Sequence, residues 1–265
     1  MPSLTEYNSD SNYFKGLFVG KNGSGKTLAL SSFPKPMKIY DFDGRLAPLI
    51  NLLSDSQKDG IDAELIGPDK FAKFCNDFQE LQDDYRFKTI VIDSLTSLSM
   101  TAVNYYLRLK GKTGGGKKIG TSQTQVPTWD EVNGETAVIS QILDVAKVMK
   151  CHVIMTAHPV GKMEITANDK GGRKTTSIVA FGHKVPTIIP NYFNEIYQFF
   201  IESGFDNDNN TIPRYVIYTR PNAEEDMMKT ALSLPRKIDL TSLPTVAGKR
   251  EYNVSLWHLI QESMK

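Results

Sequence analysis

An octapeptide near the amino terminus carries the residue types of a phosphate-binding loop. Residues 20–27 read GKNGSGKT, which fits the pattern G-x-x-x-x-G-K-[ST]. In such a loop the glycines let backbone N–H groups turn toward phosphate oxygens, the lysine reaches the β and γ phosphates, and the threonine hydroxyl coordinates Mg²⁺. We therefore predict that this loop binds ATP together with Mg²⁺. The expected nucleotide contacts are Gly20, Lys21, Asn22, Gly23, Ser24, Gly25, Lys26, Thr27 and Leu28.

A carboxylate at the end of a buried strand is the second candidate. Residues 89–93 read TIVID, a β-branched run typical of a strand covered on both faces of a parallel sheet. Asp93 ends this run, where it would lie beside the loop and bind Mg²⁺ with Thr27. The alternative is that Asp93 only caps the next helix. Ser94 follows it in place of glutamate, which argues against ATPases whose general base directly follows this aspartate.

A group that activates or positions the attacking water must then come from elsewhere. Asp43 lies two residues beyond a predicted strand and is the best-placed carboxylate, with Asp41 and Glu64 as weaker candidates. His158 ends the strand HVIMTAH and is placed to sense the γ phosphate and relay its presence to the next loop. The alternatives are that Asp43 is only a turn residue before glycine and that His158 is a structural residue.

Strands that alternate with helices would position these side chains. Apolar runs predict strands at 15–19, 37–41, 89–93 and 152–156, and helical spacing of apolar residues predicts helices at 69–83, 94–107 and 129–149. Such alternation indicates a parallel α/β sheet. After residue 158, short β-like runs at 163–166, 176–181, 194–201 and 215–219 predict hairpins that extend this sheet.

The predicted fold class is therefore α/β, with a mainly parallel central sheet, flanking helices and a C-terminal antiparallel hairpin extension. We expect a polar segment at 1–14 and a single domain at 15–265. In that domain the hairpin-rich part covers about 160–235, and a helix at about 255–264 closes the chain.

The composition sets limits on partners and location. The net charge of +1 gives no global attraction for nucleic acid, so a polyanion site requires a local cluster of basic residues. No window contains the 18 or more apolar residues of a membrane helix. We expect a cytoplasmic protein without membrane contact.

The order of these motifs resembles the RecA-type recombinases, and among them the small phage-encoded RecA-like ATPases associated with single-strand annealing. The resemblance covers residues 16–235. YDFDGRLAPL resembles the family's second-strand motif, which makes Asp43 the counterpart of its catalytic glutamate, although the aspartate is one methylene shorter. IVIDSLTSL resembles its Walker B segment with Asp93, and VIMTAH puts His158 where the family has a Gln or His switch residue.

This resemblance implies an oligomeric, Mg²⁺-dependent ATPase of RecA-like fold that binds single-stranded DNA in recombination, annealing or repair. It implies self-association into a ring or filament, in the host cytoplasm if the protein is phage-encoded. In the family a basic residue of the neighbouring subunit completes the ATP site, and Arg220 and Lys229 are similar in position to such residues. Either residue could instead be an ordinary surface charge.

Two basic, glycine-rich stretches, residues 110–128 and 161–184, fall where the family has its DNA-binding loops. Flexible cationic loops can follow a phosphate backbone. The candidate DNA contacts are Lys117, Lys118, Arg173 and Lys174. The alternative is that these charges are only solvated surface.

Two other functions stay open. A P-loop phosphotransferase acting on a nucleotide or a small molecule would need an Arg-rich lid over its acceptor, whereas the candidate lid region here is rich in Lys and Gly. An ATP-switched adaptor or loader without recombinase activity would use ATP binding only to change shape.

Overall fold

The computed structural model describes most of the chain between residues 13 and 264. The exceptions are 85, 110–116, 120–121, 125–126, 165–172, 181, 183, 207, 222–226, 242–244, 247–248 and 251–255. Within 117–124, 162–176 and 242–250 only the backbone of the short strands is described.

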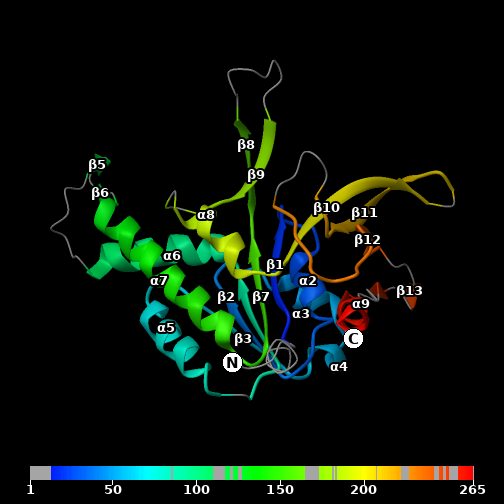
Figure 1. The fold of residues 1–265 in the computed structure, drawn as a ribbon, viewed down its shortest axis with the longest axis horizontal. Helices are drawn as coiled ribbons and strands as arrows, with labels where there is room; N and C mark the ends of the chain where they lie inside the picture. The colour runs from blue at the N-terminus through cyan, green and yellow to red at the C-terminus, as the bar shows by residue number, and fades with distance from the viewer. Residues whose placement is uncertain are drawn as a thin grey trace, which may run out of the picture.

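An eight-stranded sheet forms the centre of the molecule (Figure 1). Its strands are β1 (Lys15–Gly20), β2 (Met37–Asp41), β3 (Ile61–Leu65), β4 (Thr89–Asp93), β7 (His152–Ala157), β10 (Glu195–Phe205), β11 (Thr211–Tyr218) and β12 (Lys237–Asp239). They lie in the order β12-β11-β10-β1-β7-β4-β2-β3. From β10 to β3 all neighbours pair in parallel, while β11 and β12 are added by antiparallel pairing. The predicted fold class is thus confirmed.

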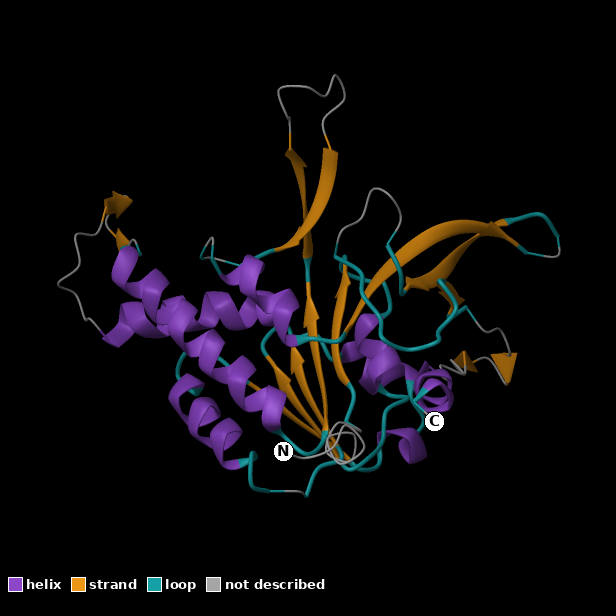
Figure 2. Cartoon of the chain, in the orientation of Figure 1, coloured by secondary structure: helices purple, strands orange, loops and turns teal. Residues whose placement is uncertain are grey.

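Helices cover both faces of this sheet, as Figure 2 shows. One face packs against α5 (Phe71–Glu80), α6 (Leu95–Leu109) and α7 (Trp129–Val148), together with α8 (Val185–Ile188) and the 3₁₀ helix η2 (Ile189–Tyr192). The other face packs against α2 (Lys26–Leu30), α3 (Ala47–Leu52) and α9 (Leu256–Ser263). The short helix α4 (Asp55–Lys58) buries none of its residues.

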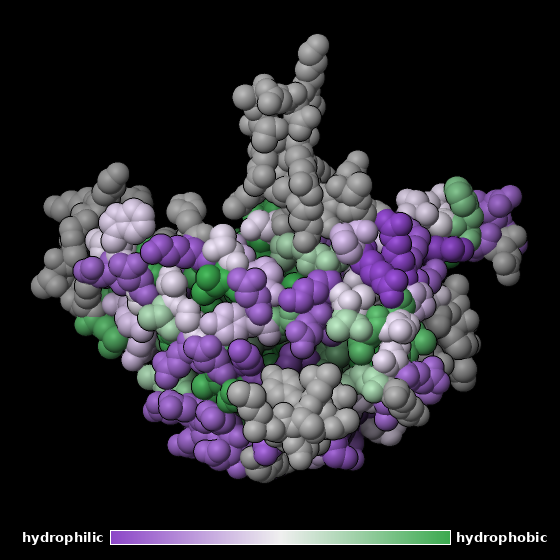
Figure 3. All heavy atoms as spheres, in the orientation of Figure 1, coloured by the Kyte–Doolittle hydropathy of each residue, from purple (hydrophilic) through white to green (hydrophobic). Residues whose placement is uncertain are grey.

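Burial on both sides explains why the central strands read as continuous apolar runs. Every residue of β4 is buried, as the sequence TIVID predicts for a strand between two helical layers. Around this core, the surface in view is a mixture of hydrophilic and hydrophobic residues (Figure 3). In the described part of the chain, no helix combines the length and the hydropathy needed to cross a membrane.

The parallel pairing brings the predicted functional residues to one edge of the sheet. β7 lies between β1 and β4, and β2 lies beside β4. Because these four strands run in one direction, their carboxyl ends meet at the same edge. The glycine-rich loop after β1, Asp43 after β2, Asp93 and His158 are therefore neighbours.

The predicted hairpin extension is correct only in part. Strands β10, β11 and β12 extend the sheet, but β8 (Pro159–Glu164) and β9 (Arg173–Ile178) pair only with each other. This hairpin projects beyond the carboxyl edge of the sheet (Figure 1). The reason is that β8 continues directly from β7, whose neighbours β1 and β4 end at this level. Beyond this level, the strand that lies beside β8 and pairs with it is β9, which returns toward the sheet.

Two further backbone hairpins are short. Strands β5 (Lys117–Ile119) and β6 (Ser122–Thr124) pair between α6 and α7, in the stretch 110–128 that was predicted to be a loop. Strands β13 (Thr245–Val246) and β14 (Lys249–Arg250) pair ahead of α9.

Candidate active site

The loop after β1 has the backbone that its glycines permit. Gly23 and Gly25 have φ angles of 76° and 92°, in the left-handed region that glycine adopts without the cost that a Cβ atom imposes. The side chain of Ser24, between them, is buried, and its hydroxyl has no hydrogen-bond partner. A buried donor without a partner suits a loop that receives an oxygen-rich ligand.

Lys26, the first residue of α2, points back into this loop. Its ammonium group donates hydrogen bonds to the carbonyl oxygens of Gly20 (2.7 Å) and Lys21 (3.0 Å). Burial lowers the pKa of Lys26 to about 8, although the negative charges of Asp93 and Asp43 oppose this shift. At neutral pH the site therefore holds a buried cation close to the loop amides.

Asp93 faces the loop from the end of β4. The Thr27 hydroxyl donates to its Oδ2 atom at 3.0 Å, and the Thr156 hydroxyl donates to Oδ1. Burial raises the pKa of Asp93, and these two hydrogen bonds reduce the shift. The predicted alternative, a cap on the next helix, has less support, because the Ser97 N–H in the first turn of α6 donates to the Ser94 hydroxyl instead.

The pair of Thr27 and Asp93 fits Mg²⁺ chemically, since an adjacent hydroxyl and carboxylate are the hard oxygen ligands that this ion prefers. In the described residues, here or elsewhere, no group of three or more His, Cys, Asp or Glu side chains could hold a metal. An ion held by two side chains takes its other ligands from water and phosphate, which is how Mg²⁺ is commonly bound.

Asp43 is held in a turn organised by Asp41. One carboxylate oxygen of Asp41 accepts the N–H groups of Asp43 (3.0 Å) and Gly44 (2.8 Å). The carboxylate of Asp43 accepts hydrogen bonds from the Ser94 hydroxyl (2.8 Å) and the His158 Nε2 (3.2 Å). Asp41 therefore supports the turn, and Asp43 extends from it into the site.

The surroundings of Asp43 favour its ionised form. Burial alone would raise its pKa, but hydrogen bonds from His158, Ser97 and Ser94 outweigh burial and lower the pKa below the ordinary value for aspartate. A carboxylate of this kind stays charged at neutral pH. It is better suited to orienting a water molecule than to storing a proton.

Glu64, the other weaker candidate for this role, lies outside the site. It is on β3 and its carboxylate forms ion pairs with Lys38 (3.6 Å), Lys70 (3.7 Å) and Lys73 (3.9 Å). Of the three candidate carboxylates, Asp43 alone lines the pocket.

His158 links the loop, Asp43 and the β8–β9 hairpin. Its Nδ1 lies 3.3 Å from the Gly20 carbonyl oxygen, and its Nε2 lies 3.2 Å from Asp43. Both neighbours accept hydrogen bonds, so the imidazolium form can donate to both at once whereas the neutral ring can donate to one. The His158 carbonyl accepts the Val179 N–H (2.9 Å), which joins the end of β9 to the start of β8.

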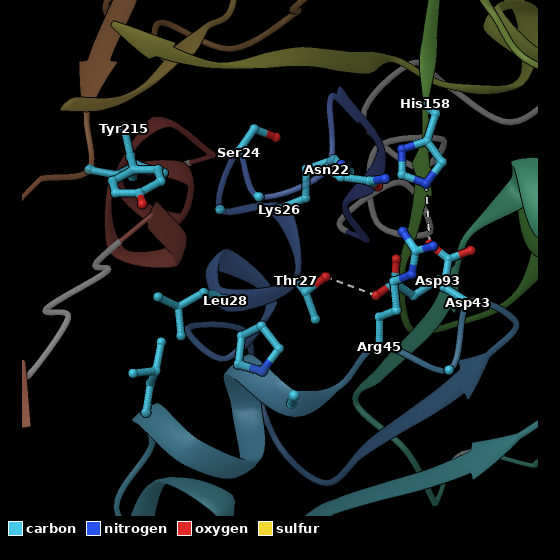
Figure 4. A pocket seen from close by; sticks show the side chains of 17 residues that line it. Asn22, Ser24, Lys26, Thr27, Leu28, Asp43, Arg45, Asp93, His158 and Tyr215 are labelled. Carbon is cyan, nitrogen blue, oxygen red and sulfur yellow. Dashed lines mark hydrogen bonds and ion pairs between the residues drawn. The ribbon is translucent and has the colours of Figure 1, made fainter. Parts of the chain in front are cut away.

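These groups surround a cavity of about 440 Å³ (Figure 4), within the range of small-ligand sites. Its charged end holds the side chains already described, and Arg45 as well. The rest of its lining is largely apolar and consists of Leu28, Ala47, Pro48, Leu52, Tyr215 and Leu240.

Sequence reasoning did not identify Arg45 or, apart from Leu28, the apolar lining. Arg45 directly follows the Asp-Gly turn, and this position was the one signal that could have pointed to it. Tyr215 and Leu240 come from distant parts of the chain, on β11 and after β12. No local pattern could have linked them to the loop.

Arg220 and Lys229 do not line the cavity. Arg220, after β11, and Lys229 are both exposed, and the Lys229 ammonium lies 3.4 Å from the Pro190 carbonyl oxygen. The backbones of Lys117, Lys118, Arg173 and Lys174 are in strands β5 and β9, but their side chains lie outside what the structure describes. Their predicted contact with DNA stays a prediction.

A glycine-rich loop between β1 and α2, a buried lysine inside it, and a Thr–Asp pair at the carboxyl edge of a parallel sheet together define a P-loop nucleotide-binding protein. A family model described as an AAA domain matches residues 12–226, so the chain belongs to this family of P-loop ATPases. A comparison with curated proteins found no match.

Proposed function

We propose that the protein is an oligomeric, Mg²⁺-dependent ATPase of RecA-like type that binds single-stranded DNA in recombination, annealing or repair. The observation that supports this best is the position of His158. It contacts the nucleotide loop and Asp43, and it is also the residue from which the β8–β9 hairpin leaves the sheet. One side chain thus connects a candidate hydrolysis site to a candidate DNA-binding element.

For hydrolysis we assign each group in the pocket a role. Lys26 and the loop amides hold the phosphates, while Thr27 and Asp93 hold Mg²⁺. When bound, the ion would neutralise charge on the β and γ phosphate oxygens. Asp43 orients the attacking water, since its carboxylate stays ionised among its hydrogen-bond donors.

For DNA binding we assign the cations of the two hairpins, Lys117 and Lys118 in β5 and Arg173 and Lys174 in β9. A nucleotide that displaces His158 from Gly20 or Asp43 would change the base of the β8–β9 hairpin. ATP and DNA would then each tighten the binding of the other by the same factor.

For self-association we assign Arg220 and Lys229 to the site of a neighbouring subunit. Both are exposed, and neither lines the pocket of its own chain. In a ring or a filament, these two side chains could reach the ATP site of the adjacent subunit.

The test is ATP turnover with and without single-stranded DNA, together with a screen of nucleoside acceptors. Turnover that rises with DNA supports the proposal. Phosphate transfer to an acceptor would establish the phosphotransferase alternative. Nucleotide binding without affinity for single strands at low salt would favour an adaptor or loader and contradict the DNA assignment.

Salt dependence tests the DNA contacts directly. If the hairpin cations neutralise phosphates, the logarithm of the DNA-binding constant should fall with the logarithm of the salt concentration, with a slope of about −0.7 for each phosphate neutralised. The double variant Lys117→Ala/Lys118→Ala should make this slope shallower by one or two such steps. The double variant Arg173→Ala/Lys174→Ala should do the same independently. The control is Lys147→Ala/Lys150→Ala, which removes two exposed cations near the opposite edge of the sheet. Equal slopes in all variants would contradict the assignment.

The part of the pocket near Tyr215, which lies away from Asp43 and His158 in Figure 4, is suited to the nucleotide base, and the ring of Tyr215 should stack on that base. Its backbone is held by two hydrogen bonds, from its N–H to the Thr241 hydroxyl (2.6 Å) and from the Leu240 N–H to its carbonyl oxygen (2.8 Å). We expect Tyr215→Ala to weaken ATP binding about tenfold, because stacking of a base on an aromatic ring contributes roughly 1–3 kcal/mol. Tyr215→Phe should bind like the wild type. Titration calorimetry measures both, and equal affinity in the alanine variant would remove Tyr215 from the base site.

A further inference from the structure

We propose that Arg45 is a catalytic residue that contacts the terminal phosphate of the ATP bound to its own chain. This inference rests on the proposed ATPase function and names a group that the nucleotide loop, Asp43 and Asp93 do not supply. Arg45 lines the same cavity as Lys26, Asp93 and His158. In Figure 4 it stands on the side of Asp43, Asp93 and His158, away from Tyr215.

The backbone that carries Arg45 is fixed at the carboxyl edge of the sheet. The Asp41 carboxylate accepts the backbone N–H groups of Asp43 and Gly44, the residue directly before Arg45. The Asp41 carbonyl oxygen accepts the Ile66 N–H at 2.8 Å, which joins the turn to the segment after β3. These contacts fix the backbone of the turn up to Gly44, so the Arg45 side chain leaves the backbone at a defined position next to Asp43.

The charge of Arg45 has no partner in the described residues. The ion pairs and hydrogen bonds found there include none to its guanidinium, and the side chain is exposed. The two nearby carboxylates already accept other donors, since Asp43 accepts from Ser94 and His158 and Asp93 accepts from Thr27. A guanidinium that lines a phosphate pocket without an internal ion pair is free to bind the ligand.

The chemistry of arginine suits this position. Its planar fork of N–H donors matches two oxygens of a phosphate group, which the single ammonium of Lys26 does not. In hydrolysis, the water oxygen forms a bond to the γ phosphorus as the bond from that phosphorus to the β–γ bridging oxygen breaks. ATP and water give ADP, inorganic phosphate and one proton, and arginine exchanges no proton in this step. Its contribution is to stabilise negative charge on the oxygens in the transition state.

This assignment differs from that of Arg220 and Lys229, which are assigned to a neighbouring subunit. Arg45 is on the turn after β2 and acts on the nucleotide held by the loop after β1 of the same chain. A monomer would therefore keep the contribution of Arg45, whereas it would lose that of the neighbouring cations.

The test compares Arg45→Ala and Arg45→Lys with the wild-type chain. We expect the alanine variant to lower kcat about 10²-fold, the loss typical of one charge-stabilising donor, with little change in ADP affinity. ADP with Mg²⁺ and aluminium fluoride mimics the transition state of phosphoryl transfer. The affinity of the protein for this complex should fall in parallel with kcat. Arg45→Lys should restore only part of the activity, because lysine cannot replace the fork.

The control is Arg86→Ala, which removes an exposed arginine paired with Asp84 outside the pocket and should leave all three quantities unchanged. Wild-type hydrolysis that persists in Arg45→Ala would overturn this inference and leave the ATPase proposal intact. A wild-type chain without hydrolysis would overturn the ATPase proposal itself. The remaining possibility is that Arg45 acts on the nucleotide of a neighbouring chain. Mixing Arg45→Ala with Lys26→Ala subunits tests it, because activity would recover in the mixture only if Arg45 acts in this way.

Discussion

Replacing Lys26 with alanine should lower ATP hydrolysis by more than about 10³-fold, because phosphoryl transfer depends on positioned cations at the β and γ phosphates. Among the described residues, the Lys26 ammonium donates only to the loop carbonyls of Gly20 and Lys21. A negatively charged phosphate oxygen would attract this ammonium more strongly than the neutral carbonyl oxygens do, so the side chain is available to a bound nucleotide. Single-turnover hydrolysis with labelled ATP measures the loss.

The fold should survive this change. Burial lowers the pKa of Lys26 from 10.5 to about 8, so the charged form is less stable in the folded chain than in the unfolded one. The protonated lysine therefore opposes folding below pH 8, and this penalty decreases as the pH rises from 8 toward 10.5. Since alanine carries no charge to bury, we expect no decrease in the melting temperature at pH 7.

Lys88→Ala provides the control for this prediction. Lys88 is an exposed lysine outside the pocket, so removing its charge should change hydrolysis little. A Lys26→Ala variant that hydrolyses ATP near the wild-type rate would contradict the assignment of the loop.

The parts of the fold that local patterns encode were predictable from the sequence. The strands β1, β2, β4 and β7 are short apolar runs, and their type and position agree with the prediction. β1 ends at Gly20, β2 at Asp41, β4 at Asp93 and β7 directly before His158. Helices α5, α6 and α7 follow the predicted helical spacing to within a few residues. From these elements the parallel sheet follows, and with it the meeting of Lys26, Asp93 and His158 at one edge.

The parts that depend on contacts between distant segments were not predictable. The pairing of β8 with β9 alone depends on where β1 and β4 end, which is a property of the assembled sheet. Strand β3 reads IDAEL and has no buried residue. Its apolar and polar residues alternate as in a strand, but Asp, Ala and Glu are depleted in strands, so the signal of this short run is weak. Tyr215 reaches the loop only because β11 joins the sheet through β10. The role of Arg45 is hidden for another reason, since an arginine after an Asp-Gly turn is usually a surface residue.

The other large effect is expected at Asp43. Asp43→Asn should bind ATP as the wild type does and hydrolyse it about 10² to 10⁴ times more slowly, the range for loss of a positioned acid–base group. Asparagine keeps the shape of the side chain and an oxygen that can accept from Ser94, but it lacks the negative charge. Binding should persist because Asp43 contacts Ser94 and His158 and not the loop amides.

The pH dependence makes this prediction more specific. Hydrogen bonds from His158, Ser97 and Ser94 outweigh burial and hold the pKa of Asp43 below the ordinary value of 3.8. A carboxylate whose pKa is lowered in this way is ionised at every pH above 3.8, so its charge is lost only as the pH falls below 3.8. Hydrolysis by the wild type should therefore show no decrease caused by Asp43 between pH 8 and about pH 5.

Glu64→Gln is the matched control for Asp43→Asn, because it makes the same chemical change in a carboxylate whose ion pairs lie with Lys38, Lys70 and Lys73 outside the pocket. It should hydrolyse ATP normally. The reverse result, normal turnover in Asp43→Asn and slow turnover in Glu64→Gln, would mean that the catalytic carboxylate is on β3. Slow turnover in Asp43→Asn with equally weakened ATP binding would give Asp43 a role in holding the loop through His158, since loss of water positioning alone leaves nucleotide affinity unchanged.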